Sequence, residues 1–269
     1  MRTPIPAALT AILCICTPPA PAESVGSSVS VELLAEGGRP LPLYPAPNHS
    51  GAARVYAEAQ MNQGYAIRVR NNTGRRVGLV IAVDGRNILS GAQSWLGPRE
   101  RMYVLEPYGC QEYAGWRSSQ DRIHRFYFTN PSDSYAGAFG DESAMGLVAV
   151  AVYVETRPLS RSRIAIPDRF GTPMPSCPPA PEGAPRESRK AEAPGLDLES
   201  RAGTGYGAED FSPSVTVSFT PESAPREKVL IKYEWRETLL RLGVIPRHQP
   251  HSPRNRLWDE GYAPPPPRW

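Results

Sequence analysis

Residues 65–87 have the sequence YAIRVRNNTGRRVGLVIAVDGRN, and this stretch decides the fold class. Apolar and polar or small residues alternate over 65–70, which is the pattern of a strand that is buried on one face. Residues 77–83 are almost wholly apolar and predict a central strand that is covered on both faces. Between them, residues 71–74 (NNTG) are typical of a tight turn. We therefore predict a β-hairpin here.

Further strand patterns recur at short intervals along the chain, as in a sandwich or barrel. The predicted strands are residues 28–34, 55–59, 102–105, 112–117, 123–128, 144–154, 214–219 and 228–233, with the Pro-rich residues 41–47 as an edge strand or a connector. One helix is predicted over residues 235–242, where Trp235, Leu239 and Leu242 share a face and Gly243 follows as a cap.

Composition divides the chain into five parts. Prolines and charges replace any strand or helix pattern after residue 156, and ordered patterns return near residue 213. The predicted parts are a signal peptide (1–22), a β-sandwich domain (23–156), a Pro-rich linker or insertion (157–212), a returning β-hairpin plus helix that completes the sandwich (213–246), and a disordered Pro-rich tail (247–269).

The first residues indicate export. Arg2 precedes an apolar run over residues 5–15, and Ala20-Pro21-Ala22 forms a small-x-small cleavage pattern. The apolar run is too short for the roughly 20 residues of a membrane span. We expect a soluble exported protein, periplasmic or extracellular, with no transmembrane span. The 30 Lys and Arg against 27 Asp and Glu give a net charge of +3, which argues against a nucleic-acid partner.

Signal cleavage would leave two cysteines, Cys110 and Cys177. In an oxidising compartment an even pair predicts a disulfide, worth roughly 4 kcal/mol in the chain-entropy model for a loop of this length. The alternatives are two free thiols, or a nucleophilic Cys110 assisted by His124.

Neither metal nor cofactor chemistry has a strong sequence pattern, so we expect no cofactor. The turn at Asp84-Gly85 lacks the later acidic ligands of a calcium loop. Asp133, Asp141 and Glu142 share one loop, but the solubility of a loop explains acidic residues equally well. The pair His248 and His251 is interrupted by a proline. Catalytic motifs such as Gly-x-Ser-x-Gly, a phosphate loop or Cys-x-x-Cys are absent from the sequence, so we assign no catalytic residue.

Aromatic residues are the candidates for binding. The residues of one cluster are Trp95, Tyr103, Tyr108, Tyr113 and Trp116. Flat rings can stack on sugars or on protein partners, whereas Tyr103 and Trp116 can equally belong to the core. We take Trp95, Tyr108 and Tyr113 as candidate binding residues. The prolines at 264–267 favour a polyproline II segment that could dock into an aromatic groove or simply solubilise the end of the chain.

Several short segments carry a resemblance. They are RNNTGRRV (70–77), VDGRN (83–87), GWR (115–117), FYFT (126–129), SYA (134–136), GTGYG (203–207) and the ending at 233–245. In this order they resemble a group of uncharacterised exported bacterial β-sandwich proteins, over about residues 54–156 and 203–246. The resemblance implies the fold and the export of the chain, and it implies no activity.

Together these patterns predict an all-β protein, an Ig-like or jelly-roll antiparallel sandwich with one C-terminal helix and long Pro-rich disordered segments. The predicted function is that of an exported, non-enzymatic binding or structural module of the bacterial envelope that engages protein or glycan. The alternative is a hydrolase or isomerase that acts on an envelope polymer through loop carboxylates. Two carboxylates about 5–10 Å apart in a cleft would favour the alternative.

Overall fold

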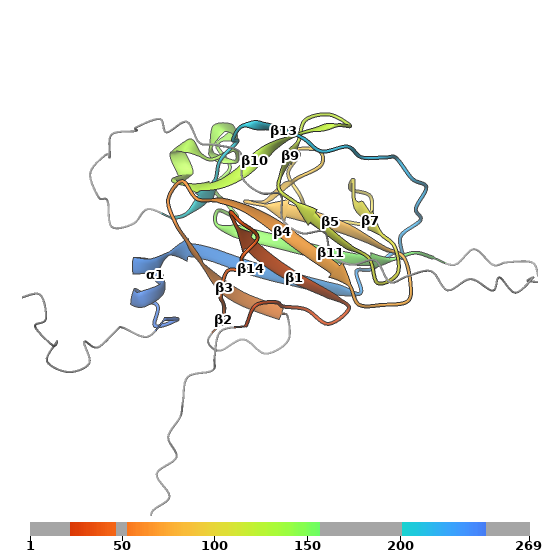
Figure 1. Ribbon diagram of the computed structural model, residues 1–269, viewed down its shortest axis with the longest axis horizontal. Coiled ribbons are helices and arrows are strands. Elements are labelled where there is room, and N and C mark those ends of the chain that lie inside the picture. Colours follow the sequence, from red (N-terminus) through yellow and green to blue (C-terminus); the bar gives the residue numbers. More distant parts are fainter. Residues whose placement is uncertain (1–21, 47–52, 157–200, 246–269) are drawn as a thin grey trace, which may run out of the picture.

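The computed structural model describes residues 22–46, 53–156 and 201–245. As predicted, these residues are nearly all β, with one short C-terminal α-helix. The strands form two sheets whose inward faces pack against each other, which is compatible with a β-sandwich (Figure 1). The predicted parts of the chain that fall on residues 1–21, 157–200 and 246–269, with Cys177, lie outside the described residues.

The first sheet is built on strand β4, and the second on strands β5, β11 and β14. The strands of the first sheet are β1 (Val29–Ala35), β4 (Gly64–Asn71), β8 (Cys110–Tyr113), β9 (Gly115–Arg117), β10 (Arg122–Thr129), β12 (Gly203–Thr204) and β13 (Glu209–Phe211). Those of the second are β2 (Leu43–Pro45), β3 (Ala53–Ala59), β5 (Val77–Val83), β6 (Arg86–Asn87), β7 (Tyr103–Leu105), β11 (Leu147–Val154) and β14 (Glu227–Trp235).

Strand β5 is buried on both faces, as its apolar sequence predicts. Its inward residues, such as Ile81, join the core between the sheets. Its outward residue Val80 lies in a second apolar cluster with Tyr153, and the loop residues Leu96 and Phe219 pack against that cluster. Loops therefore cover the outer face of this sheet, which is why β5 needs apolar residues at every position.

The predicted hairpin between β4 and β5 is wrong, because the two strands belong to different sheets. The Asn71 amide donates to the carbonyl oxygens of Arg75 (2.7 Å) and Glu106 (2.9 Å). The Asn71 side-chain oxygen accepts from the Thr73 amide at 3.0 Å. These bonds hold an arch that leads from one sheet to the other. The alternation over residues 65–70 and the apolar run over residues 77–83 had predicted two buried strands correctly, but such local patterns do not specify the partners of a strand.

The predicted strand over residues 214–219 is also wrong. Residues 212–221 form no strand; they make an extended connection, here called the strap, from β13 of the first sheet to the end of β11 in the second. The strap is the blue segment that arches beyond β5 and β7 in Figure 1. The strand predicted over 228–233 is confirmed as β14, which pairs antiparallel with β11 and parallel with β3. It thus completes the middle of the second sheet.

The C-terminal helix is shorter than predicted. Helix α1 (Arg236–Arg241) has Trp235 as its N-cap residue, and Gly243 follows it with a positive φ of 70°. Of the predicted apolar face, Leu239 is buried and Leu242 is exposed. The helix lies beside β14 and β3 at one end of the molecule (Figure 1).

Candidate functional site

The most exposed aromatic ring in the described part of the chain is that of Trp95, with 80 % of its surface accessible. Trp95 belongs to the Trp95 loop, defined as residues 94–100, which lies between β6 and β7. A large apolar side chain in water gains nothing for folding. Tryptophan is also enriched among the residues that dominate the binding energy of protein interfaces, so Trp95 is a candidate binding residue.

Glu100 holds the Trp95 loop in one conformation. Its carboxylate accepts the backbone N–H groups of Trp95 (3.0 Å) and Gly97 (2.8 Å). It also accepts the Ser94 hydroxyl (2.7 Å) and the Asn87 side-chain amide (3.1 Å). Burial opposes ionisation of Glu100, but these hydrogen bonds outweigh it and lower the pKa of the carboxyl. An ionised Glu100 thus accepts the hydrogen bonds that hold the Trp95 loop together.

Leu96 anchors the same loop to the body of the protein. Its φ of 57° lies in the left-handed region, which costs a non-glycine residue on the order of 1 kcal/mol or more. The Leu96 carbonyl accepts the Tyr153 hydroxyl at 2.6 Å, and its side chain packs beside Val80. Leu96 therefore points inward while its neighbour Trp95 points to solvent. The backbone that carries the exposed indole is therefore held in place by its neighbour Leu96.

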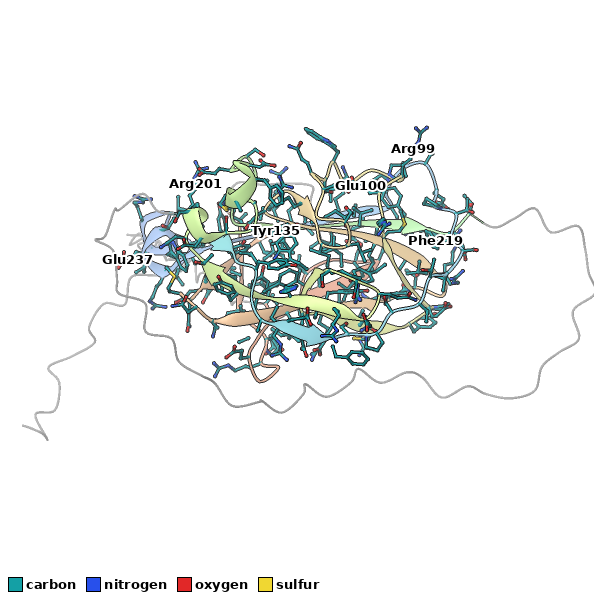
Figure 2. The ribbon with its side chains drawn as sticks, turned by 90° about the horizontal axis from the view of Figure 1, so that it is seen from above. Arg99, Glu100, Tyr135, Arg201, Phe219 and Glu237 are labelled. Atoms are coloured by element: carbon teal, nitrogen blue, oxygen red, sulfur yellow. The ribbon has the colours of Figure 1, made fainter. Side chains whose placement is uncertain are left out.

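A groove of about 1120 Å³ begins at the end of this loop. It lies between β7 of the second sheet and β8 and β9 of the first, and the strap forms its outer wall. The lining residues used below are Arg99, Glu100, Arg101, Glu112, Tyr113 and Arg117. Figure 2 shows Arg99 and Glu100 on one side of the molecule, with Phe219 of the strap at the same end. The volume slightly exceeds the roughly 300–1,000 Å³ of typical small-molecule sites.

The wall of the groove contains a buried polar atom without a partner. Tyr113 is 5 % exposed, and its hydroxyl makes no hydrogen bond within the described residues. Burial is the main reason that the pKa of Tyr113 is well above its ordinary value, and the nearby Tyr103 adds to it. An unsatisfied buried hydroxyl costs about 1–3 kcal/mol, and in this structure the Tyr113 hydroxyl is closed off from the groove by its own burial.

The strap is attached to the groove at its two ends and not between them. Arg117 donates to the carbonyl oxygen and the hydroxyl of Ser212 at 2.8 and 3.2 Å. At the other end, the carbonyl oxygen of Thr220 accepts the backbone N–H of Thr156 at 2.8 Å. Residues 215–218 make no hydrogen bond in the described structure and are exposed. The middle of the strap is therefore free to pair with another chain.

The ionic groups of the groove are unevenly paired. Glu112 is bound by Arg68, whose Nη2 lies 2.6 Å from the carboxylate, and Glu100 is occupied within the Trp95 loop. Arg99 and Arg101 are exposed and form no ion pair with any residue that the structure describes. The side chains of Arg99 and Arg101 thus make neither an ion pair nor a hydrogen bond among the described residues, whereas both carboxylates of the lining are occupied. A third arginine, Arg117, has no ion pair either, but it is hydrogen-bonded to Tyr103 and Ser212. The mouth of the groove is positively charged.

The three predicted binding residues are placed differently. Trp95 does not itself line the groove, but residues 98–100 of its loop do, and Tyr113 lines the groove from its buried wall. Tyr108 is 49 % exposed at the turn opposite Thr73, outside the residues that line the groove. The sequence analysis did not single out Glu100, although a glutamate placed after Ser94 and Gly97 was a detectable pattern for a stapled loop.

The predicted disulfide between Cys110 and Cys177 stays a prediction, because only Cys110 lies in the described residues, at the start of β8. A titration of thiols in the denatured, unreduced protein would test it. The catalytic alternative for Cys110 gains no support from His124. That ring stacks on Tyr206 at 3.9 Å, and its Nδ1 lies 3.0 Å from the carbonyl oxygen of Gly207.

A stack of aromatic rings covers part of β10. His124 lies over Tyr206, and Tyr206 lies over Tyr135 with the centroids 5.3 Å apart. These rings are within 17° of parallel, so each ring has a face that is covered by its neighbour. Phe139, 58 % exposed, meets Tyr135 edge-on. The stack holds segment 203–207 against the first sheet, and it is a weaker platform for a ligand than the free ring of Trp95.

A buried carboxylate lies at the far end of β5. Asp84 is inaccessible to solvent and accepts the backbone N–H groups of Gly146 and Thr204, each at 2.7 Å. The Tyr233 hydroxyl donates to it at 2.6 Å. The Thr204 hydroxyl lies 2.5 Å from the Tyr233 hydroxyl and 2.7 Å from that of Tyr65. Every partner is a core group, and none of these residues lines the groove described above, so we assign the cluster the role of joining the strands.

No family model, curated protein or solved structure matches this chain. The resemblance to exported β-sandwich proteins stays an expectation. Among the residues that the structure describes, no cluster of three or more His, Cys, Asp or Glu is placed to hold a metal ion. No helix in these ranges is long and apolar enough to cross a membrane.

Proposed function

We propose that this chain is a non-enzymatic binding module that acts at the bacterial envelope after export, and that it engages a partner protein through Trp95. The observation that supports this proposal best is an indole that is 80 % exposed on a loop stapled by Glu100. Tryptophan is enriched among the residues that dominate binding energy in protein interfaces. A loop that is already ordered loses little conformational freedom on binding, so more of the contact energy remains as affinity.

The hydrolase alternative has less support. A glycosidase-like site needs two carboxyl groups in a cleft, one of them free to donate or accept a proton. The two carboxylates that line the groove are Glu100 and Glu112, and each is already bonded. The lowered pKa of Glu100 also makes it a poor general acid at neutral pH. Both groups are better suited to hold the site together.

The proposal can be tested with a photo-crosslinking amino acid at position 95 in cells that export the protein, and with the same amino acid at position 211 as a control. Phe211 is also a strongly exposed aromatic residue, 68 % accessible, but it stands on β13 of the first sheet and not on the Trp95 loop. We expect a protein adduct from position 95 that position 211 does not give. The partner, identified by mass spectrometry, is then purified and titrated.

In that titration we expect Trp95→Ala to weaken binding by at least tenfold, about 1.4 kcal/mol or more, as for an interface anchor. Phe211→Ala should leave the affinity unchanged. Equal adducts from the two positions, or equal affinities of the two variants, would refute the proposal.

A further inference from the structure

We propose that the groove beside the Trp95 loop binds an acidic, extended peptide segment of a partner protein, which adds to the free edge of β7 as a further β-strand beneath the strap. This inference deepens the proposed function, on which it rests, because it assigns a second contact and its chemistry to the same surface. It also makes predictions that do not involve Trp95.

The backbone of β7 provides the first argument. Within the described residues β7 pairs with β5 and with no other strand, so half of its N–H and C=O groups face away from the sheet. The whole strand, Tyr103–Leu105, lines the groove. An exposed strand edge is the usual template for the addition of an extended peptide, whose main chain supplies the hydrogen bonds.

The strap provides the second argument. Residues 215–217 line the groove opposite β7, and residues 215–218 form no hydrogen bond in the described structure. The strap is attached at Ser212 and Ser214 on one side and at Thr220 on the other. An extended segment inserted beside β7 would therefore lie under a chain that is anchored at both ends. Val215 and Val217, 82 % and 48 % exposed, would cover it.

Charge provides the third argument and decides which peptide fits. Arg99 and Arg101 have no ionic partner within the described residues, whereas Glu100 and Glu112 are occupied. A peptide with acidic side chains would neutralise the two guanidinium groups, and a basic peptide would meet them unpaired. The occupant is thus extended, acidic and able to pair through its backbone.

The experiment uses a displayed library of random twelve-residue peptides, selected on the purified full-length protein. The same selection is made on the double variant Arg99→Glu/Arg101→Glu. As a matched control for charge, we use Arg39→Glu/Arg54→Glu, because these two arginines are also exposed and lie on the β1–β2 turn and on β3, away from the groove. We expect acidic peptides to be enriched on the wild type and on the control, and not on the groove variant.

A selected peptide is then measured by calorimetry. Its affinity should fall at least tenfold on the groove variant, fall with added salt, and stay unchanged on the control and on Trp95→Ala. Backbone pairing is tested with two versions of the peptide that are N-methylated at alternate amides, in opposite phases. Loss of binding in at least one of them is expected, since methylation removes the donors that face β7.

Three results would overturn the inference: no peptide enriched over the groove variant, enrichment of basic peptides, or full affinity in both methylated versions. Each of these can occur while position 95 still crosslinks to a partner, so the failure of this inference is distinguishable from the failure of the proposed function. Conversely, peptide binding without any adduct at position 95 would support the groove alone.

Discussion

Replacement of Asp84 by asparagine should remove a pH dependence of stability that this one carboxyl group creates. Asp84 lies in the core and accepts two backbone N–H groups and the Tyr233 hydroxyl. Burial raises its pKa from 3.8 to about 6, although the hydrogen bonds from Tyr233, Thr204 and Gly146 act in the opposite direction. In the unfolded chain the same group has its ordinary pKa.

The sign and size of the effect follow from this difference. The folded protein binds the proton of Asp84 more tightly than the unfolded chain does. The stability that the group contributes is therefore complete below about pH 4 and is lost as the pH rises through about 6. A shift of about 2 pKa units corresponds to about 3 kcal/mol. Above that window the protein stays folded with Asp84 ionised, because three hydrogen-bond donors surround the carboxylate.

Urea unfolding of the wild type and of Asp84→Asn, measured between about pH 3.5 and pH 7.5, gives the effect as a difference. Glu100 and Glu227 have lowered pKa values, so they contribute stability above their unfolded pKa that is lost on acidification. Both proteins contain these groups, and the difference cancels them. We expect the stability of the wild type relative to the variant to fall by about 3 kcal/mol as the pH rises through this window.

Two hydroxyl deletions make the test specific. Tyr233→Phe removes a donor to the carboxylate and should raise the pKa of Asp84 further. Tyr65→Phe is the matched control, because its hydroxyl is bonded to Thr204 and not to Asp84. The carboxyl carbon of Asp84, followed by NMR in the wild type, should titrate near pH 6. A midpoint at or below pH 4, or a stability difference that does not change with pH, would refute the reasoning.

Three further predictions concern the Trp95 loop, a tightly packed glycine, and the place of β14 between β3 and β11. Glu100→Ala should speed hydrogen exchange at the Trp95 amide by at least tenfold, because the acceptor is lost; unchanged exchange would show that the loop does not need it. Gly115→Ala should destabilise the fold by about 1–3 kcal/mol in urea, since its Cβ would lie 2.2 Å from the backbone carbonyl oxygen of His124; a neutral variant would contradict this packing. A protein cut at an engineered site between residues 157 and 200 should elute as one complex under reducing conditions, because β14 lies between β3 and β11; separate elution of the pieces would contradict the shared sheet.

The sequence predicted the strands better than it predicted their partners. The alternation from Tyr65 and the apolar run at 77–83 correspond to β4 and β5, and the run at 144–154 contains β11. Residues 71–74 have hairpin composition, yet Asn71 uses its side chain to hold an arch between two sheets. Turn composition specifies that the chain bends. Contacts with distant residues, such as the bond from Asn71 to Glu106, decide whether the next strand lies in the same sheet or in the other one.

The candidate site was predicted only at Trp95 and Tyr113. Residues 214–219 have the alternation of a strand, but no neighbouring strand is available to them where β13 ends, and they cross between the sheets instead. The groove exists because of that crossing, so a local pattern could not show it. Tyr108, like Trp95, has a proline and a glycine within three residues, and the arch opposite Thr73 separates it from the groove.

The arrangement along β5 separates the stability of the fold from the proposed binding surface. β7 and the groove adjoin the first residues of β5, Val77–Leu79, whereas Asp84 follows its last residue. At about 3.3 Å per residue the two ends are roughly 20 Å apart, and the strand between them is buried on both faces. Changes in Arg99, Arg101 or residues 215–218 of the strap therefore touch exposed groups that carry little of the folding energy. We expect such changes to alter affinity and leave the titration of Asp84 where it was, and a shift of that titration in the groove variant would show that the two ends are coupled.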